Sequence, residues 1–227
     1  PELSRRYVTL LELGGSHVHS FRDLIDALGI ATLIIGDLDA TAAVKIIDKN
    51  GKETTRWKSA RPEQGKEQQT ANSVLKEWHP KKKLIDELVA LVPEGHVSDG
   101  GEDYDLYVAY QKPVKIESGG QDDGIVIPRT FEDALILENL ATIENVEGSV
   151  TSAKVQAIVA QGLSGDDLED ELFELLKTAE KAAFALDCLM LEDPTALKPP
   201  SYIAAGLKWF ERAVSKDIAE SELKTGQ

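Results

Sequence analysis

The sequence contains very little sulfur, with one cysteine, Cys188, and one methionine in 227 residues. A single cysteine excludes an internal disulfide and is typical of proteins that fold in a reducing compartment. The chain also lacks any run that approaches the roughly 18 apolar residues of a membrane-spanning helix. Its first residues lack the order of basic, apolar and small residues that marks a signal peptide. These absences predict a cytoplasmic protein that does not act in a membrane.

A phosphate-binding loop of the form G-x-x-x-x-G-K-[ST] is also absent. The chain starts at Pro1 without an initiator methionine and enters a strand pattern almost at once, which predicts a fragment of a longer protein. If that parent protein uses a nucleoside triphosphate, its phosphate-binding loop is expected outside these residues.

The sequence has an excess of negative charge, with 40 acidic residues, 25 basic residues and a net charge of −15. Basic residues gather locally, in residues 56–66 and 81–83. Proteins that bind nucleic acid usually present a basic face to the phosphates, so such binding would depend on these patches, which are otherwise solvated surface. Divalent cations at a carboxylate site would offset part of the negative charge.

The first 40 residues alternate between strand and helix patterns. The apolar run at residues 7–11 (YVTLL) predicts a buried strand that ends at Glu12. Apolar residues then repeat at helical spacing over residues 21–28 before Gly29, and residues 31–35 (ATLII) predict a second buried strand. This is the pattern of a right-handed βαβ unit, in which both strands end at the same edge of one sheet.

The following residues predict more strands and then helices. Residues 44–47 and 53–57 flank a turn and predict a β-hairpin, and residues 106–110 predict a further strand. Thr130 is expected to begin a helix, because acidic residues occupy its first turn. We predict an α/β protein of the Rossmann-like type, with a mainly parallel central sheet flanked by helices.

The patterns become mostly helical from about residue 140, and Pro199 and Pro200 separate the last two predicted helices. We therefore predict two parts. Residues 1–140 form the sheet-containing domain, and residues 141–227 form a mostly helical subdomain.

Two carboxylates, Asp37 and Asp39, follow the second predicted strand. If the chain stays extended there, alternation places both on one side. Mg²⁺ prefers oxygen ligands and is often held by one or two carboxylates together with substrate phosphates. Glu12 should reach the same edge, and three carboxylates repel one another unless a cation or protons neutralise them. This predicts a divalent-metal site, although acidic pairs also cap helices and close turns.

The succession of a strand ending in glutamate, a helix, and a strand ending in D-x-D resembles Toprim domains. These occur in topoisomerases, bacterial primases and the OLD (overcoming lysogenisation defect) family of ATP-dependent nucleases. The resemblance to the OLD family extends through several blocks in one order and spans nearly the whole chain. The blocks are LLELGGSHVHSFRDLIDALGIATLIIGDLDA, QQTANSVLKEW, RTFEDALILEN, KAAFALDCL and PPSYIAAGLKWF.

The resemblance implies a Toprim fold and an endonuclease that hydrolyses phosphodiester bonds of DNA with two Mg²⁺ or Mn²⁺ ions. It implies that Glu12, Asp37 and Asp39 are catalytic as metal ligands, that Glu132 completes the second metal position, and that Lys181 assists catalysis at the phosphate. It also implies an ABC-type ATPase domain, absent from these residues, that sets the oligomeric state of the parent protein.

Four positions qualify what the resemblance implies. Many Toprim proteins have glycine directly after the glutamate and an acidic residue four positions after it, whereas Leu13 and Ser16 stand there in this chain. Arg129 is expected either to bind a DNA phosphate in a bidentate fork or to pair with an acid. Lys181 can act only if its helix folds back against the edge of the sheet.

Two other functions fit part of the pattern. Residues 36–41 (GDLDAT) also match the D-x-D-x-[TV] element of haloacid-dehalogenase-like phosphatases, with Asp37 as the nucleophile and Asp39 as the acid and base. That element normally follows the first strand of its fold, and Glu12 would then have no role. The second alternative is a non-catalytic interaction module whose acidic residues only maintain solubility.

Overall fold

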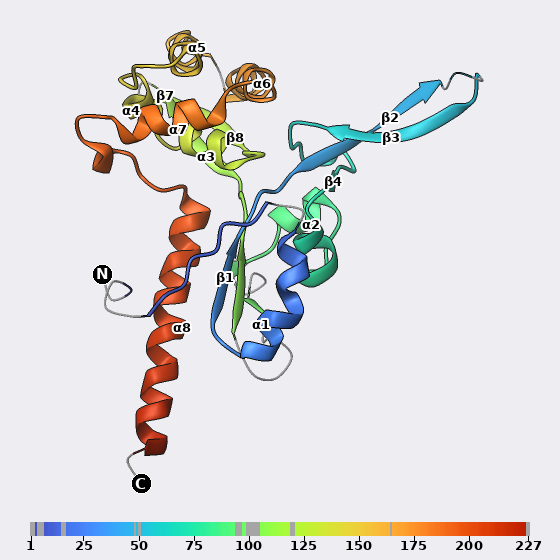
Figure 1. The fold of residues 1–227 in the computed structure, drawn as a ribbon. Helices are drawn as coiled ribbons and strands as arrows, with labels where there is room; N and C mark the ends of the chain where they lie inside the picture. Colours follow the sequence, from blue (N-terminus) through green and yellow to red (C-terminus); the bar gives the residue numbers. More distant parts are fainter. Residues whose placement is uncertain are drawn as a thin grey trace.

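The computed structural model describes residues 3, 7–14, 17–47, 49, 51–93, 97–98, 105–118, 121–163 and 165–225. Figure 1 shows a small sheet with helices on both faces, a long hairpin that projects away from it, and a group of helices above it. No helix of the described residues combines the length and the apolar character needed to cross a membrane.

A parallel pair of strands forms the centre of the fold. β1 (Thr32–Ile35) pairs in parallel with β6 (Leu106–Ala109), so that Thr32 lies opposite Leu106. The short β5 (Val97–Ser98) pairs antiparallel on the other side of β6. All four residues of β6 are buried, as expected for a strand that is covered on both faces.

Different helices cover the two faces of this sheet. Ile34 and Val108 pack in one cluster with residues of η3 (Val74–Trp78) and α2 (Ile85–Val89), and α1 (Arg22–Leu28) packs against this cluster through Ile25. On the opposite face, the long helix α8 (Ser201–Thr225) lies along β1 and β6 (Figure 1).

Gly206 allows α8 to approach the sheet closely. A Cβ atom at this position would lie 2.9 Å from a methyl carbon of Leu33 and 3.2 Å from the Cβ atom of Ala109. A larger residue would therefore push the helix away from the strands.

The prediction of a strand at residues 7–11 is wrong. Residues 7–14 form neither helix nor strand, and the side chains of Tyr7 and Leu10 are 98% and 91% exposed. An apolar run indicates a preference for burial, but a strand also needs backbone partners and a packed face, which depend on tertiary structure. The predicted βαβ unit is therefore not formed, and β1 instead pairs in parallel with β6.

The neighbouring predictions are confirmed. Helix α1 ends at Gly29, whose φ of 57° is left-handed and therefore suits glycine, and β1 follows three residues later. The α/β class is also confirmed, because a parallel strand pair lies between layers of helices. Among the described strands, parallel pairing is confined to β1 and β6.

The predicted hairpin is confirmed and is longer than expected. β2 (Ala40–Ile47) and β3 (Glu53–Ser59) pair antiparallel from Thr41 opposite Ser59 to Ile47 opposite Glu53. The two-residue strand β4 (Gln69–Thr70) pairs with the first residues of β2. β2 begins directly after Asp39, so the hairpin starts where the D-x-D motif ends.

The remaining elements form a second, mostly helical core. They are β7 (Val114–Ser118), β8 (Gln121–Val126), α3 (Phe131–Leu137), α4 (Leu140–Ile143), α5 (Val150–Val159), α6 (Gly165–Leu176), α7 (Lys181–Leu189) and η5 (Pro194–Ala196). The helical character predicted from residue 140 onward is confirmed. One buried cluster joins Val114 and Leu135 to Val155, Leu172 and Cys188, so it contains residues from both sides of the predicted boundary at residue 140. The two-domain division stays a prediction.

Arg61 connects the segment after the hairpin to α6. Its guanidinium lies 3.1 Å from carboxylate oxygens of Asp166 and Glu169 and 2.8 Å from one of Asp170. Glu169 is buried, and its Oε1 atom has no hydrogen-bond partner among the described residues. Burial raises the pKa of Glu169 to about 8, although the hydrogen bond and positive charge of Arg61 oppose the rise.

The raised pKa of Glu169 predicts how stability depends on pH. The carboxyl group binds its proton more tightly in the folded state than in the unfolded state, where its pKa is near 4.5. Its contribution to the free energy of unfolding is therefore complete below about pH 4.5 and is lost as the pH rises through about 8. Glu169→Gln cannot ionise, so its free energy of unfolding should change less between pH 5 and pH 8 than that of the wild type.

This prediction can be checked with urea unfolding curves at several pH values. Glu171→Gln, at an exposed position of the same helix, is the matched control and should retain the wild-type pH dependence. Equal pH dependence of Glu169→Gln and the wild type would contradict the assignment.

Candidate active site

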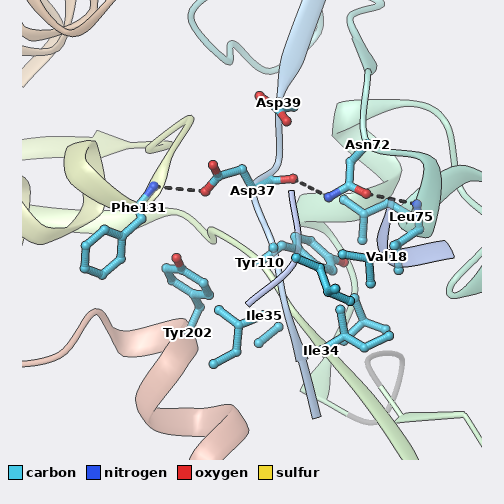
Figure 2. A pocket seen from close by; sticks show the side chains of 15 residues that line it. Val18, Ile34, Ile35, Asp37, Asp39, Asn72, Leu75, Tyr110, Phe131 and Tyr202 are labelled. Atoms are coloured by element: carbon cyan, nitrogen blue, oxygen red, sulfur yellow. Dashed lines mark hydrogen bonds between the residues drawn. The ribbon is translucent and has the colours of Figure 1, made fainter. Parts of the chain in front are cut away.

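A pocket of about 260 Å³ lies where β1 and β6 end (Figure 2). Its lining includes the apolar side chains of Ile34 and Leu75 and the polar side chains of Asp37, Asp39 and Asn72. Gly36 permits the close approach of Asn72, since a Cβ atom there would lie 3.1 Å from the amide nitrogen of that side chain. Asn72 donates a 2.8 Å hydrogen bond to the backbone carbonyl of Asp37.

Two donors hold the side chain of Asp37. The amide of Gln111 donates a 2.7 Å hydrogen bond to Oδ1. The backbone N–H of Phe131 donates a second one at 3.0 Å, which Figure 2 shows. Burial raises the pKa of Asp37 to about 6, against the effect of the Gln111 hydrogen bond, and the negative charges of Asp39 and Glu132 raise it further. Asp37 is therefore a partly desolvated carboxyl group with other negative charges nearby.

Asp39 takes a different direction from Asp37. Its φ of 49° lies in the left-handed region, so the chain is not extended here and the expected alternation of the two carboxylates does not apply. Aspartate tolerates this conformation better than most residues, and such strain is often found at functional sites. The carboxylate of Asp39 lies 2.9 Å from the guanidinium of Arg129, so Arg129 pairs with an acid in this structure.

The beginning of α3 brings Glu132 and Lys181 together. Asp133 reaches back to accept a 2.9 Å hydrogen bond from the backbone N–H of Thr130, which stabilises the start of the helix. Glu132, in the same turn, lies 2.8 Å from the ammonium group of Lys181 at the start of α7. Helix α7 thus folds back toward the edge of the sheet, as a role for Lys181 requires. The positive charge of Lys181 partly opposes the rise in the pKa of Asp37.

The structure does not bring Glu12 to this group. Glu12 is exposed in the irregular segment 7–14, although its neighbour Leu13 lines the pocket. Within the described part of the chain, no group of three or more histidine, cysteine, aspartate or glutamate side chains is close enough to hold a metal ion. Because residues 7–11 do not pair with β1, the strand that should deliver Glu12 to the edge is missing. The assignment of Glu12, Asp37, Asp39 and Glu132 as ligands stays a prediction.

Comparison with known proteins agrees with the resemblance noted in the sequence. Residues 1–39 match the family model described as the Toprim domain of overcoming lysogenization defect protein-like proteins. These residues include the D-x-D motif that ends beside the pocket. The first 39 residues of the chain are therefore similar to a Toprim domain of the OLD type.

One curated relative matches this chain over nearly its full length. It is Endonuclease GajA from Bacillus cereus (strain HuB5-5), which is 25% identical over 218 residues. The match covers 93% of this chain and 28% of the relative, so the chain spans less than a third of that protein. No solved structure was found to match the chain.

Sequence reasoning missed three residues around Asp37. Gln111 is fully buried and connects Asp37 to the hydroxyl of Tyr202, to which it donates a 3.2 Å hydrogen bond. Asn72 positions the backbone of Asp37 from another segment. One signal was available, because Gln111 is a polar residue directly after the strand predicted at residues 106–110. In the structure this strand pairs in parallel with β1, so it ends at the same edge as D-x-D. Tyr202 and Asn72 lie within blocks of the OLD resemblance but offered no chemical signal of their own.

Proposed function

We propose that this chain is the nuclease region of an OLD-type DNA endonuclease and that it hydrolyses phosphodiester bonds with Mg²⁺ or Mn²⁺. The observation that carries the proposal is that the charges of Asp39, Glu132 and Lys181 act on Asp37, which follows β1 within the residues that match the Toprim family model. The name of the relative, an endonuclease, supports the same chemistry.

The donors of the site suit hard divalent cations. Aspartate and glutamate provide oxygen ligands, and the charges of Asp39 and Glu132 destabilise ionised Asp37 in a way that a cation would relieve. Both hydrogen bonds to the carboxylate of Asp37 go to Oδ1, and Oδ2 accepts none from the described residues. We propose that Asp37, Asp39 and Glu132 hold the metal, with Glu12 joining them when segment 7–14 reaches the edge of the sheet.

A pair of bound metal ions would activate water and stabilise the leaving oxygen of the phosphodiester. The protein itself supplies orientation and charge. Gln111 and the backbone N–H of Phe131 hold Asp37 in place, which limits the reorganisation needed during the reaction. Lys181 places a positive charge beside Glu132, where it can stabilise the negative charge that develops on the phosphate. Arg129 binds a substrate phosphate when it leaves Asp39.

The proposed arrangement of the parent protein follows the family resemblance. Residues 1–140 form the Toprim domain, and residues 141–227 form a helical subdomain that contributes Lys181. An ABC-type ATPase domain elsewhere in the parent protein sets the oligomeric state.

The first test is cleavage of supercoiled plasmid DNA. Nicked or linear DNA should form with Mg²⁺ or Mn²⁺, whereas Ca²⁺ should not support cleavage, because it accepts looser and higher coordination and is a weaker Lewis acid. Gel electrophoresis of reactions with each metal, and with an excess of chelator, measures this.

Cleavage that persists in excess chelator would contradict a metal-dependent nuclease. Hydrolysis of a small phosphomonoester with a phosphorylated Asp37 intermediate would instead support the phosphatase alternative. Neither result would change the fold assignment.

A further inference from the structure

The hairpin of β2 and β3 differs in charge from the rest of the chain. Residues 40–59 contain five basic residues and two acidic ones, in a protein with a net charge of −15. Figure 1 shows that the hairpin extends away from the sheet and the helices, so most of its length is open to solvent. Its strand β3 is exposed at every position except Thr54.

Two cations of the hairpin are available for a partner. Lys45 is engaged with Glu53 at 2.7 Å, whereas Arg56 and Lys58 are exposed and pair with no acid among the described residues. The strand register places Arg56 opposite Val44 and Lys58 opposite Ala42, so both cations lie on one face of the ribbon. On the other face, Trp57 is 45% exposed.

The hairpin is also fixed to the candidate active site. β2 starts at Ala40, immediately after Asp39, and the backbone at its base is held by hydrogen bonds from Ala71 to Asp39 (2.8 Å) and from Ala60 to Ala40 (3.0 Å). Eight residues of strand reach about 26 Å from this base. The width of the major groove of B-DNA, about 12 Å, admits a ribbon of two strands.

We propose that this hairpin is an arm that binds duplex DNA, with Arg56 and Lys58 contacting phosphates of the DNA that lies next to the cleaved bond. The inference rests on the proposed nuclease function and identifies the surface that brings the substrate to the site. An acidic protein repels DNA at long range. A basic arm that starts beside the carboxylates would attract the DNA phosphates locally, despite the negative net charge of the chain. A duplex held at the base of the arm lies next to the pocket, because the arm starts at Ala40 and the preceding residue, Asp39, lines the pocket.

The test compares Arg56→Gln, Lys58→Gln with a matched pair, Lys154→Gln, Lys198→Gln, at exposed lysines outside the hairpin. Binding of a labelled duplex is measured by fluorescence anisotropy in Ca²⁺ over a series of salt concentrations. Each lost phosphate contact lowers the slope of log affinity against log salt by about 0.9, so the hairpin variant should lose about 1.8 from the slope. Its affinity at about 0.1 M salt should fall at least about tenfold, whereas the control pair should match the wild type.

Hydrolysis of a small chromogenic phosphodiester separates this inference from the proposed function. The hairpin variant should hydrolyse it at the wild-type rate, because a small substrate does not reach the arm. If the wild type binds and cuts DNA but the hairpin variant keeps its affinity and salt slope, the arm is refuted and the nuclease remains. If the wild type cuts neither plasmid nor the small diester, the nuclease itself fails. If the hairpin variant changes its oligomeric mass but keeps the DNA affinity of the wild type, the hairpin mediates contact between copies of the chain. That result would also overturn the proposal.

Discussion

Asp37→Asn should abolish cleavage of plasmid DNA, with a loss in rate of at least about 10³-fold. The substitution removes the negative charge but keeps an oxygen that can accept the hydrogen bonds from Gln111 and the backbone of Phe131. The fold should therefore be preserved. Since burial and neighbouring carboxylates disfavour the ionised form of Asp37, the free energy of unfolding in the absence of metal should not decrease and is expected to rise.

The measurements for Asp37 are single-turnover cleavage in Mg²⁺ and thermal unfolding in chelator. Asp39→Asn should also abolish cleavage, although it breaks the ion pair with Arg129 and so perturbs the local structure more. Asp23→Asn, at an exposed position of α1, serves as the control and should cleave at the wild-type rate. Metal-dependent nicking at the normal rate by Asp37→Asn would eliminate the proposed site.

Lys181→Ala should reduce the turnover rate by about 10²-fold or more, as expected for the loss of one electrostatic contact to the transition state. Metal affinity should change little, because lysine is not a ligand. Lys181→Arg should restore only part of the rate, since a wide planar guanidinium does not replace a compact ammonium group. The 2.8 Å distance between Lys181 and Glu132 makes this prediction specific, because it places the ammonium group beside the carboxylate of Glu132.

Lys177 offers a closely matched control for Lys181. Its side chain is 37% exposed, against 35% for Lys181, and it also forms an ion pair, at 2.6 Å from Glu174. Lys177→Ala should therefore show what the loss of an ordinary ion-paired lysine does to the protein. Steady-state cleavage together with metal titration distinguishes a lower turnover rate from weaker metal binding. Near-normal turnover of Lys181→Ala would remove lysine from the proposed mechanism.

Local signals in the sequence predicted much of the fold. Gly29 ends a helix because it adopts a left-handed conformation, and the turn residues between β2 and β3 predicted a hairpin. Thr130 was expected to begin a helix, and Asp133 caps its first turn as a short-range interaction should. Such features depend on residues a few positions apart, so one segment of sequence contains all the information they need.

The strand predicted at residues 7–11 failed for the opposite reason. Its apolar side chains could favour burial anywhere, and only the assembled sheet determines which segment pairs with β1. β6, more than 70 residues further along the chain, is the parallel partner of β1. The position of Glu12 depended on that pairing, so the structure does not bring Glu12 to the edge where Asp37 and Asp39 lie.

The sequence by itself determined which chemical groups this protein can use. It placed Asp37 and Asp39 directly after the strand predicted at residues 31–35, and it contained the Toprim pattern that the family comparison supports. The tertiary structure alone decided the environment of those groups. Gln111 holds Asp37 in a buried setting that raises its pKa, and Lys181 reaches Glu132 from another helix. The physical reason is that charge, desolvation and hydrogen bonding depend on distances through space, which segments far apart in sequence set only when they pack together.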